Sequence, residues 1–115
     1  MINIAITGAG GRMGKALIEA VAQVDGLQLS AAIERPDSTL IGVDSGELAG
    51  LGRNGINIAS SLQEVVDQFD VLIDFSTPAS TSDNVALCAE QGKKIVIGTT
   101  AVSYTHLTLP TILLV

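Results

Sequence analysis

The chain of 115 residues has room for one small domain. Apolar residues make up 47% of the chain and charged residues 16%, so the chain can bury a core and does not have the composition of a disordered protein. The net charge of -6 argues against nucleic-acid binding, which favours basic surfaces.

Short apolar runs rich in β-branched residues alternate with segments of helical period, and glycine or proline residues separate them. We expect strands at 2–7, 27–33, 56–59, 71–75 and 94–97, and helices at 11–24, 61–68 and 78–91. The apolar residues expected on one face of the first helix are Met13, Leu17, Ala20, Val21 and Val24.

Two connecting segments have their own local signals. Ser61 and Glu64 match a capping box at the start of the second expected helix. Residues 36–55 are rich in glycine and show no period, which predicts a long loop. The acidic residues at 44–47 lack the ligand spacing of a calcium loop, so a solvated loop is favoured over a cation site.

The alternation of strands and helices indicates right-handed crossovers and an α/β fold. We predict a Rossmann-type doubly wound parallel sheet with the strand order 3-2-1-4-5. In such sheets a ligand binds beyond the carboxyl ends of the strands, at the point where the strand order reverses. Here that point lies between the first and the fourth expected strands.

The segment GAGGRMG, residues 8–14, directly follows the first expected strand. Gly8 permits a sharp turn, Gly11 leaves bare backbone for a pyrophosphate, and Gly14 permits close packing of the helix. Free N–H groups and the dipole at the helix start favour an anion. Met13 stands where the common G-x-G-x-x-G motif has its last glycine. The context favours a dinucleotide site, and an ordinary strand-to-helix turn is the alternative.

Glu34 and Arg35 follow the second expected strand, and Glu34 lies twenty residues beyond Gly14. An acid at this distance typically accepts hydrogen bonds from the ribose hydroxyls of NAD, and an arginine can pair with the 2′-phosphate of NADP. The pair indicates a site that tolerates either cofactor; an exposed acid and base at a strand end is the alternative. Two interpretations of Arg12 stay open. Its guanidinium contacts a phosphate or the adenine, or it is a solvated arginine at the start of the helix.

The sequence also carries information on cellular location and on the roles of Cys88 and Asp74. The single cysteine, Cys88, excludes an internal disulfide, is typical of a reducing compartment, and is expected in the core. No signal peptide and no run of about eighteen apolar residues is present, so we expect a cytoplasmic protein without a membrane partner. Asp74 either orients a loop near the crevice or has a structural hydrogen bond.

Five blocks occur in order over residues 1–100: GAGGRMG, AAIER, DSGELAG, DFSTP and GKKIVIGTT. Because it contains these five blocks in this order, the chain resembles bacterial dihydrodipicolinate reductase. The resemblance implies a dinucleotide-binding domain, here 1–101, that uses NADH or NADPH. In the family a substrate domain follows, which also builds a homotetramer. The implied reaction is hydride transfer to a cyclic, imine-like dicarboxylate with loss of water, in diaminopimelate and lysine biosynthesis.

The resemblance also implies the residues of the site. The residues that would line the dinucleotide are Gly8, Ala9, Gly10, Gly11, Arg12 and Met13. Glu34 would bind the ribose and Arg35 would serve NADP. The residues expected near the nicotinamide are Gly98, Thr99 and Thr100, with Phe75 and Ser76 close to the same crevice.

The proton donors of the family lie in a His-His-x-x-Lys segment of the substrate domain, and that segment does not occur in this sequence. We therefore predict no catalytic residue and no metal ligand here, and we expect the chain alone to be inactive. A non-catalytic nucleotide-binding Rossmann module is the alternative, although DSGELAG and DFSTP favour the reductase. A fragment that aggregates through apolar surface left bare is a third interpretation.

Residues 102–115 do not resemble the family. VSYTHL, residues 102–107, matches one reading frame of a transposon-end adapter used in sequencing libraries, so our hypothesis is translated adapter read-through. His106, the only histidine, is therefore not assigned as a catalytic base. The alternative is a genuine strand, because TLPTILLV has a strong β propensity.

Overall fold

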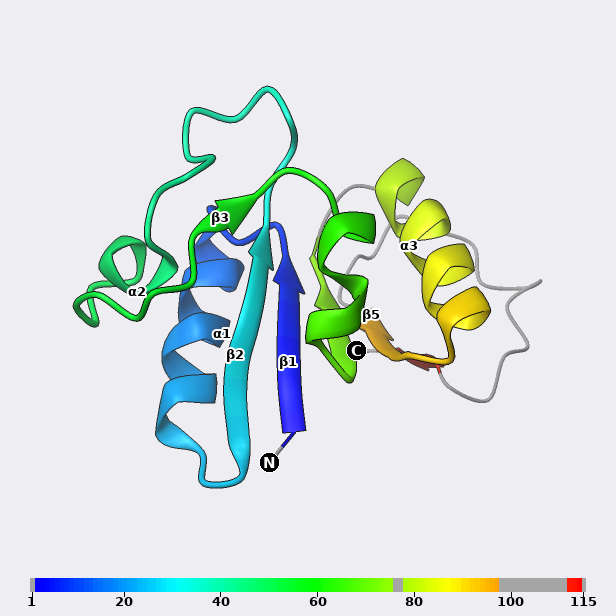
Figure 1. Cartoon of the computed structure of the whole chain (residues 1–115), viewed down its shortest axis with the longest axis horizontal. Coiled ribbons are helices and arrows are strands. Elements are labelled where there is room, and N and C mark those ends of the chain that lie inside the picture. Colours follow the sequence, from blue (N-terminus) through cyan, green and yellow to red (C-terminus); the bar gives the residue numbers. More distant parts are fainter. Residues whose placement is uncertain (1, 76–77, 98–111, 115) are drawn as a thin grey trace.

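One parallel sheet organises the chain (Figure 1). The computed structural model describes residues 2–75, 78–97 and 112–114, and in them the strand order is β3-β2-β1-β4-β5-β6. The strands are β1 (Ile2–Thr7), β2 (Leu27–Ile33), β3 (Ile58–Ala59), β4 (Val71–Asp74), β5 (Lys94–Ile97) and β6 (Ile112–Leu114). The first five strands confirm the predicted order 3-2-1-4-5. β6 lies within residues 102–115 and pairs with β5. A genuine strand is one of the two interpretations of this segment.

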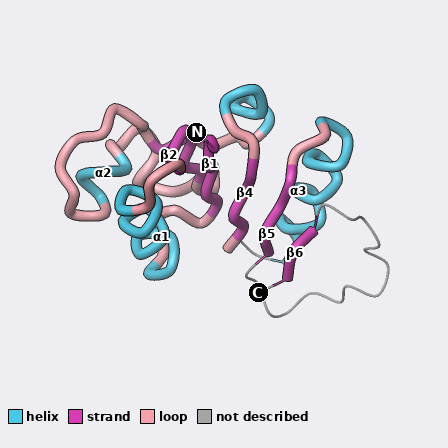
Figure 2. Tube along the Cα trace, turned by 90° about the horizontal axis from the view of Figure 1, so that it is seen from below, coloured by secondary structure: helices cyan, strands magenta, loops and turns pink. Residues whose placement is uncertain are grey.

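Helices lie on both faces of this sheet, as Figure 2 shows. They are α1 (Arg12–Gln23), α2 (Ser45–Leu48), the 3-10 helix η1 (Gln63–Gln68) and α3 (Pro78–Gln91). α1 and α2 contribute to the core on one face, whereas η1 and α3 contribute to the core on the other face. No helix in the described part of the chain is long and apolar enough to cross a membrane.

β1 shows why the sequences of the central strands are nearly continuous apolar runs. Ile4 and Ile6 belong to the core on the α1 side, and Ala5 between them belongs to the core on the α3 side. Because parallel strands covered on both faces have no solvent-facing row of residues, the alternation of polar and apolar side chains disappears. The same condition explains why the predicted bounds of β1, β2 and β5 agree with the structure.

The buried face of α1 differs from the prediction. Its buried residues are Gly14, Ile18 and Val21, with Leu17 partly buried. Met13 and Val24 were expected on this face but are 51% and 50% exposed, and Ala20 is exposed as well. The physical reason is that Gly14, which has no side chain, is the residue pressed against the preceding turn, and this contact sets the rotation of the helix.

The predicted capping box at Ser61 is wrong. η1 begins at Gln63, its N-cap residue is Leu62, and no side chain caps it. Leu62 and Phe69 flank this short segment and are 7% and 1% exposed. Because both ends are held in the core only a few residues apart, the segment forms a 3-10 helix in place of the longer α-helix that the pattern suggested.

The loop between β2 and β3 is organised by a buried carboxylate, which corrects the expectation of a solvated acidic loop. Asp44 is 6% exposed. Its side chain accepts hydrogen bonds from the N–H groups of Glu47 at 3.1 Å, Asn54 at 3.1 Å and Gly55 at 2.9 Å. Burial alone would raise the pKa of Asp44, but its backbone hydrogen bonds outweigh that effect and lower the pKa below the usual value. The carboxylate therefore caps α2 and closes the loop.

Asp44→Asn is expected to lower the urea midpoint at neutral pH, because the amide cannot accept all of these hydrogen bonds. A lowered pKa in the folded state means that Asp44 stabilises the fold above its unfolded pKa of about 3.9 and ceases to do so as the pH falls through the lower folded value. Urea unfolding at about pH 6 and about pH 3 measures this, and the variant should lose less stability between them than the wild type.

The matched control is Asp25→Asn, an exposed acid in the turn before β2. This change should leave the urea midpoint nearly unaltered at both pH values. If Asp25→Asn and Asp44→Asn behaved alike, the organising role of Asp44 would be contradicted.

Candidate functional site

A cleft of about 400 Å³ opens at the carboxyl edge of the sheet, where β1 and β4 lie side by side. Successive strands β1, β2 and β3 are added toward one edge of the sheet, whereas β4 and β5 are added toward the other edge. The strand order therefore reverses between β1 and β4. This is the place where doubly wound sheets bind ligands. The residues that line the cleft are Thr7, Gly8, Gly11, Ile33, Glu34, Arg35, Pro36, Ser60, Leu62, Phe75 and Asn84.

The glycine turn forms one wall of the cleft and leaves the start of α1 without a side-chain cap. Gly8 has a φ of 71°, in the left-handed region that favours glycine. The N–H of Ala9 donates to the Ile33 carbonyl at 3.2 Å, and the N–H of Gly11 donates to the Gly8 carbonyl at 3.1 Å. Gly11 is the N-cap of α1 and lines the cleft. The first turn of the helix, whose N–H groups lack intrahelical acceptors, therefore opens toward the cleft.

Gly14 fixes the distance between α1 and this turn. A Cβ atom at Gly14 would lie 2.3 Å from the Gly8 carbonyl oxygen and 2.7 Å from the Ala9 Cα. Both neighbours are backbone atoms of a short turn and cannot move aside without displacing it. Gly14 thus permits close packing, as predicted, and the packing partner is the glycine turn itself.

Glu34 lies at the carboxyl end of β2 and contacts the same turn. Its Oε2 accepts the N–H of Gly10 at 2.7 Å, and its Oε1 accepts the N–H of Arg35 at 3.1 Å. The side chain is partly buried and lines the cleft. The predicted acid after the second strand and the predicted glycine turn are therefore brought together.

Arg35 is exposed and also borders the cleft. Its Nε lies 3.8 Å from Oδ1 of Asp37, with side-chain exposures of 68% and 79%. Such an exposed ion pair contributes little and is readily exchanged, so the guanidinium is available to another anion. Arg12, at the start of α1, is exposed to solvent.

A buried side-chain pair joins the two central strands beneath the cleft. Thr7 and Asp74 are register partners at the ends of β1 and β4, and the Thr7 hydroxyl donates to Oδ1 of Asp74 at 2.5 Å. The two residues are 3% and 0% exposed. The next residue, Phe75, lines the cleft and donates its N–H to the Thr7 carbonyl at 3.4 Å. Of the two roles considered for Asp74, the structure shows the hydrogen bond.

Cys88 lies in the core, as predicted, and is 1% exposed. Burial raises its pKa to about 11, the negative charge of Asp74 adds to this, and the positive charge of Lys93 opposes it. The thiol is therefore protonated at neutral pH, which does not fit a nucleophile. Among the described residues, no group of three or more histidine, cysteine or acidic side chains could hold a metal ion.

Several site residues of the sequence analysis fall outside the described part of the chain: Ser76, Gly98, Thr99 and Thr100. His106, which was not assigned to the site, lies outside it as well. Conversely, sequence reasoning missed some residues of the cleft. Ser60 follows β3 just as Glu34 follows β2, so the strand-end rule could have identified it. Leu62 is the N-cap of η1 and Asn84 lies in α3, and no local pattern shows that these segments border the cleft.

Comparison with known sequences gives one family. The family model described as dihydrodipicolinate reductase, N-terminus, matches residues 2–109. The 4-hydroxy-tetrahydrodipicolinate reductase of Acinetobacter baumannii strain AYE is 60% identical over 101 residues, which are 88% of this chain and 37% of that protein. The protein of strain AB307-0294 gives the same values. The chain thus spans little more than a third of the length of these curated relatives.

Solved structures give the same fold. The dipicolinate-bound dihydrodipicolinate reductase of Paenisporosarcina sp. TG-14 has a TM-score of 0.71 at 24% identity, over 93% of this chain and 40% of the other. The myo-inositol dehydrogenase of Corynebacterium glutamicum has a TM-score of 0.69 at 23% identity, over 89% and 29%. GenD2 from gentamicin A biosynthesis, solved with NAD, has a TM-score of 0.68 at 18% identity, over 88% and 27%.

Gly14→Ala is expected to lower the free energy of unfolding by about 1–3 kcal/mol, because the added methyl group must displace backbone. Urea denaturation measures the change. Gly11→Ala is the matched control, since its Cβ would come no closer than 3.4 Å to the Gly8 carbonyl oxygen and should cost little. Equal stability of the two variants would contradict the packing argument.

Thr7→Val keeps the shape of the side chain and removes its hydroxyl, so Asp74 loses a donor in the core. We expect a loss of about 1–3 kcal/mol in the free energy of unfolding, and a smaller loss for Thr7→Ser, which keeps the hydroxyl. A double-mutant cycle with Asp74→Asn isolates the pair: the two changes together should cost less than the sum of the single changes. Strict additivity would show that the hydrogen bond does not contribute.

Proposed function

The chain belongs to the dihydrodipicolinate reductase family, and on that basis we propose that its cleft binds NADH or NADPH as the cofactor-binding part of a 4-hydroxy-tetrahydrodipicolinate reductase. The observation that carries the proposal is the uncapped start of α1, which opens toward a cleft at the reversal of strand order. A helix N-terminus of this kind is an anion site that needs no basic surface. It therefore suits a diphosphate in a protein whose net charge is -6.

Hydrogen bonds within the fold support a proposal for which amides of the turn would hold the diphosphate. The N–H groups of Ala9, Gly10 and Gly11 donate within the fold. Those of Arg12 and Met13 lie in the first turn of α1, where intrahelical acceptors are lacking. Of the segment from Gly8 to Met13, we therefore assign the diphosphate to the Arg12 and Met13 amides, and the other residues of the segment shape the turn.

The two residues after β2 would recognise the adenosine end. The Glu34 carboxylate lines the cleft and would accept hydrogen bonds from the ribose hydroxyls. Arg35 would exchange its exposed contact with Asp37 for the 2′-phosphate of NADPH. This arrangement supports the use of either cofactor.

The nicotinamide would lie on the other side of the strand reversal. Gly98, Thr99 and Thr100 follow β5 in the sequence, and β5 pairs with β4, whose end is followed by Phe75 at the cleft. Their position in sequence, directly after the carboxyl end of this strand, supports the assignment. The bound cofactor supplies the hydride, and these residues would orient its ring.

We propose that the whole family protein reduces a cyclic, imine-like dicarboxylate in diaminopimelate and lysine biosynthesis, as a homotetramer in the cytoplasm. The family match and the printed activity of the Acinetobacter relatives support the reductase activity. The homotetramer and the cytoplasmic location rest on the resemblance to the family alone. The His-His-x-x-Lys segment that would protonate the substrate does not occur in this sequence. We therefore expect the 115-residue chain to bind the dinucleotide weakly at best and not to reduce the substrate.

We also propose that residues 1–101 constitute the dinucleotide-binding domain and that 102–115 are translated adapter sequence. The curated relatives match over 101 residues, which fits this division, whereas the family model extends to residue 109 and β6 lies in the tail. The codons of residues 102–107 decide between the two interpretations. Identity with the adapter supports read-through, and a different codon series supports a genuine strand.

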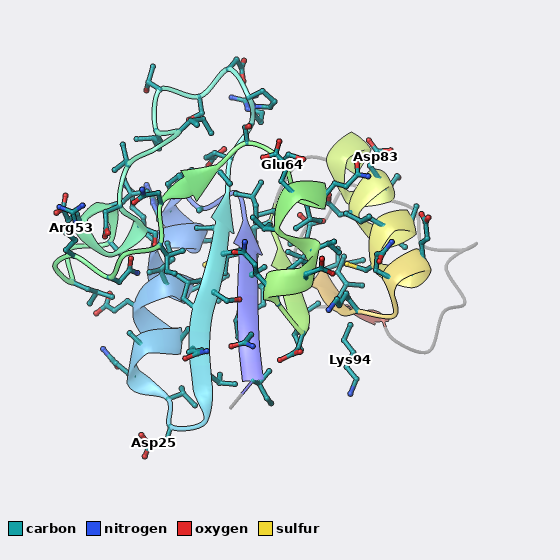
Figure 3. The ribbon with its side chains drawn as sticks, in the orientation of Figure 1. Asp25, Arg53, Glu64, Asp83 and Lys94 are labelled. Carbon is teal, nitrogen blue, oxygen red and sulfur yellow. The ribbon has the colours of Figure 1, made fainter. Side chains whose placement is uncertain are left out.

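Titration of the purified chain with NADH and NADPH, by fluorescence or calorimetry, tests the site. Glu34→Ala should weaken both cofactors by roughly tenfold to a hundredfold, since charge-assisted hydrogen bonds are lost. Arg35→Ala should weaken NADPH and leave NADH nearly unchanged. Arg53→Ala is the matched control. Arg53 lies near α2 (Figure 3) and is not among the residues that line the cleft. Binding that is unaffected by Glu34→Ala would refute this site.

A further inference from the structure

Gly10 and Glu34 lie in close contact at the glycine turn. A Cβ atom at Gly10 would lie 2.9 Å from Oε2 of Glu34 and 2.3 Å from Cδ1 of Leu40. At Gly11, by contrast, a Cβ atom would meet nothing closer than the Gly8 carbonyl oxygen at 3.4 Å. The absence of a side chain at Gly10 therefore makes room for Glu34 and Leu40, and the space at Gly11 faces the cleft.

We propose that Glu34 is a positioning residue for the diphosphate site, in addition to its role toward the ribose. Its carboxylate holds the N–H of Gly10 and so keeps the glycine turn in the shape that presents the start of α1 to an anion. The inference rests on the proposed dinucleotide site and assigns Glu34 an effect on ligand groups that it does not touch.

The glycine turn needs such an anchor, because three of the four residues from Gly8 to Gly11 are glycines and lose much conformational freedom on ordering. Two hydrogen bonds tie the turn to β2 and its carboxyl end. One joins the backbone of Ala9 to that of Ile33 at 3.2 Å, and the other joins Gly10 to the Glu34 side chain at 2.7 Å. Only the second involves a charged acceptor, and such hydrogen bonds are the stronger kind.

The two roles of Glu34 are compatible. A carboxylate offers about four lone-pair sites, and in this structure Oε2 accepts from Gly10 and Oε1 accepts from the Arg35 backbone. Sites for ribose hydroxyls therefore remain while the bond to Gly10 is kept. The same side chain can hold the adenosine end and support the turn that binds the diphosphate.

The two roles separate when the ligand has no ribose hydroxyls. We would titrate the full chain and its variants with ADP and with 2′,3′-dideoxy-ADP, which keeps the adenine and the diphosphate. A positioning role predicts that Glu34→Ala weakens both ligands, the dideoxy ligand by roughly tenfold. Glu34→Gln keeps an oxygen acceptor for Gly10, and it should largely preserve affinity for the dideoxy ligand. Arg53→Ala should change neither.

Amide hydrogen exchange at Gly10, followed by NMR, reports on the hydrogen bond without any ligand. Exchange should be roughly tenfold faster in Glu34→Ala than in the wild type, and Glu34→Gln should retain most of the protection. Melting temperatures measured in parallel show that the variants are folded.

The outcomes distinguish this inference from the proposed function. If Glu34→Ala weakened ADP alone and left Gly10 exchange unchanged, the positioning role would be overturned and the ribose role kept. If the wild type bound neither nucleotide, the proposed function would fail, and the exchange rates would still decide whether Glu34 holds the turn.

Discussion

The close contact between Gly14 and the backbone of Gly8 and Ala9 is the constraint on which the rest of the structure depends. It lets α1 begin immediately after the turn that follows β1, so the free N–H groups of the helix stand at the edge of the sheet. It also sets the rotation of α1, which places Ile18 and Val21 in the core. The proposed anion site and the packing of this face therefore depend on the same contact.

Sequence reasoning recovered the parts of the fold that a local pattern determines. β1, β2 and β5 are apolar runs bounded by turn residues, and the condition of burial on both faces explains both their composition and their bounds. The face of α1 was missed because hydrophobic periodicity gives no weight to Gly14, a residue whose contribution is the absence of a side chain. Periodicity alone therefore favoured Met13 and Val24, both of which are exposed.

In the site, too, local sequence patterns predicted some contacts, whereas contacts between residues far apart in the sequence were not predicted. The spacing between the glycine turn and Glu34 was enough to place both at one edge of the sheet. The hydrogen bond between Thr7 and Asp74 joins residues 67 positions apart and depends on the register of β1 against β4, which no local pattern contains. Asp44 was likewise expected to be solvated because it is charged. Its role instead depends on loop N–H groups that only the folded chain brings around its carboxylate.

The proposal that an acidic chain binds an anionic ligand depends on the charges and hydrogen bonds near the cleft. Among the described residues, the charged side chains that line the cleft are Glu34 and Arg35, one of each sign, so this lining does not share the overall charge of -6. Glu34 accepts hydrogen bonds from two backbone N–H groups, and Asp74 beneath the cleft accepts one from Thr7. The charges of more distant exposed acids are screened over about 8 Å at physiological salt. At the proposed site a diphosphate would meet the dipole of the helix start and the charge of Arg35 at close range, while the opposing charge of Glu34 is hydrogen-bonded to backbone N–H groups.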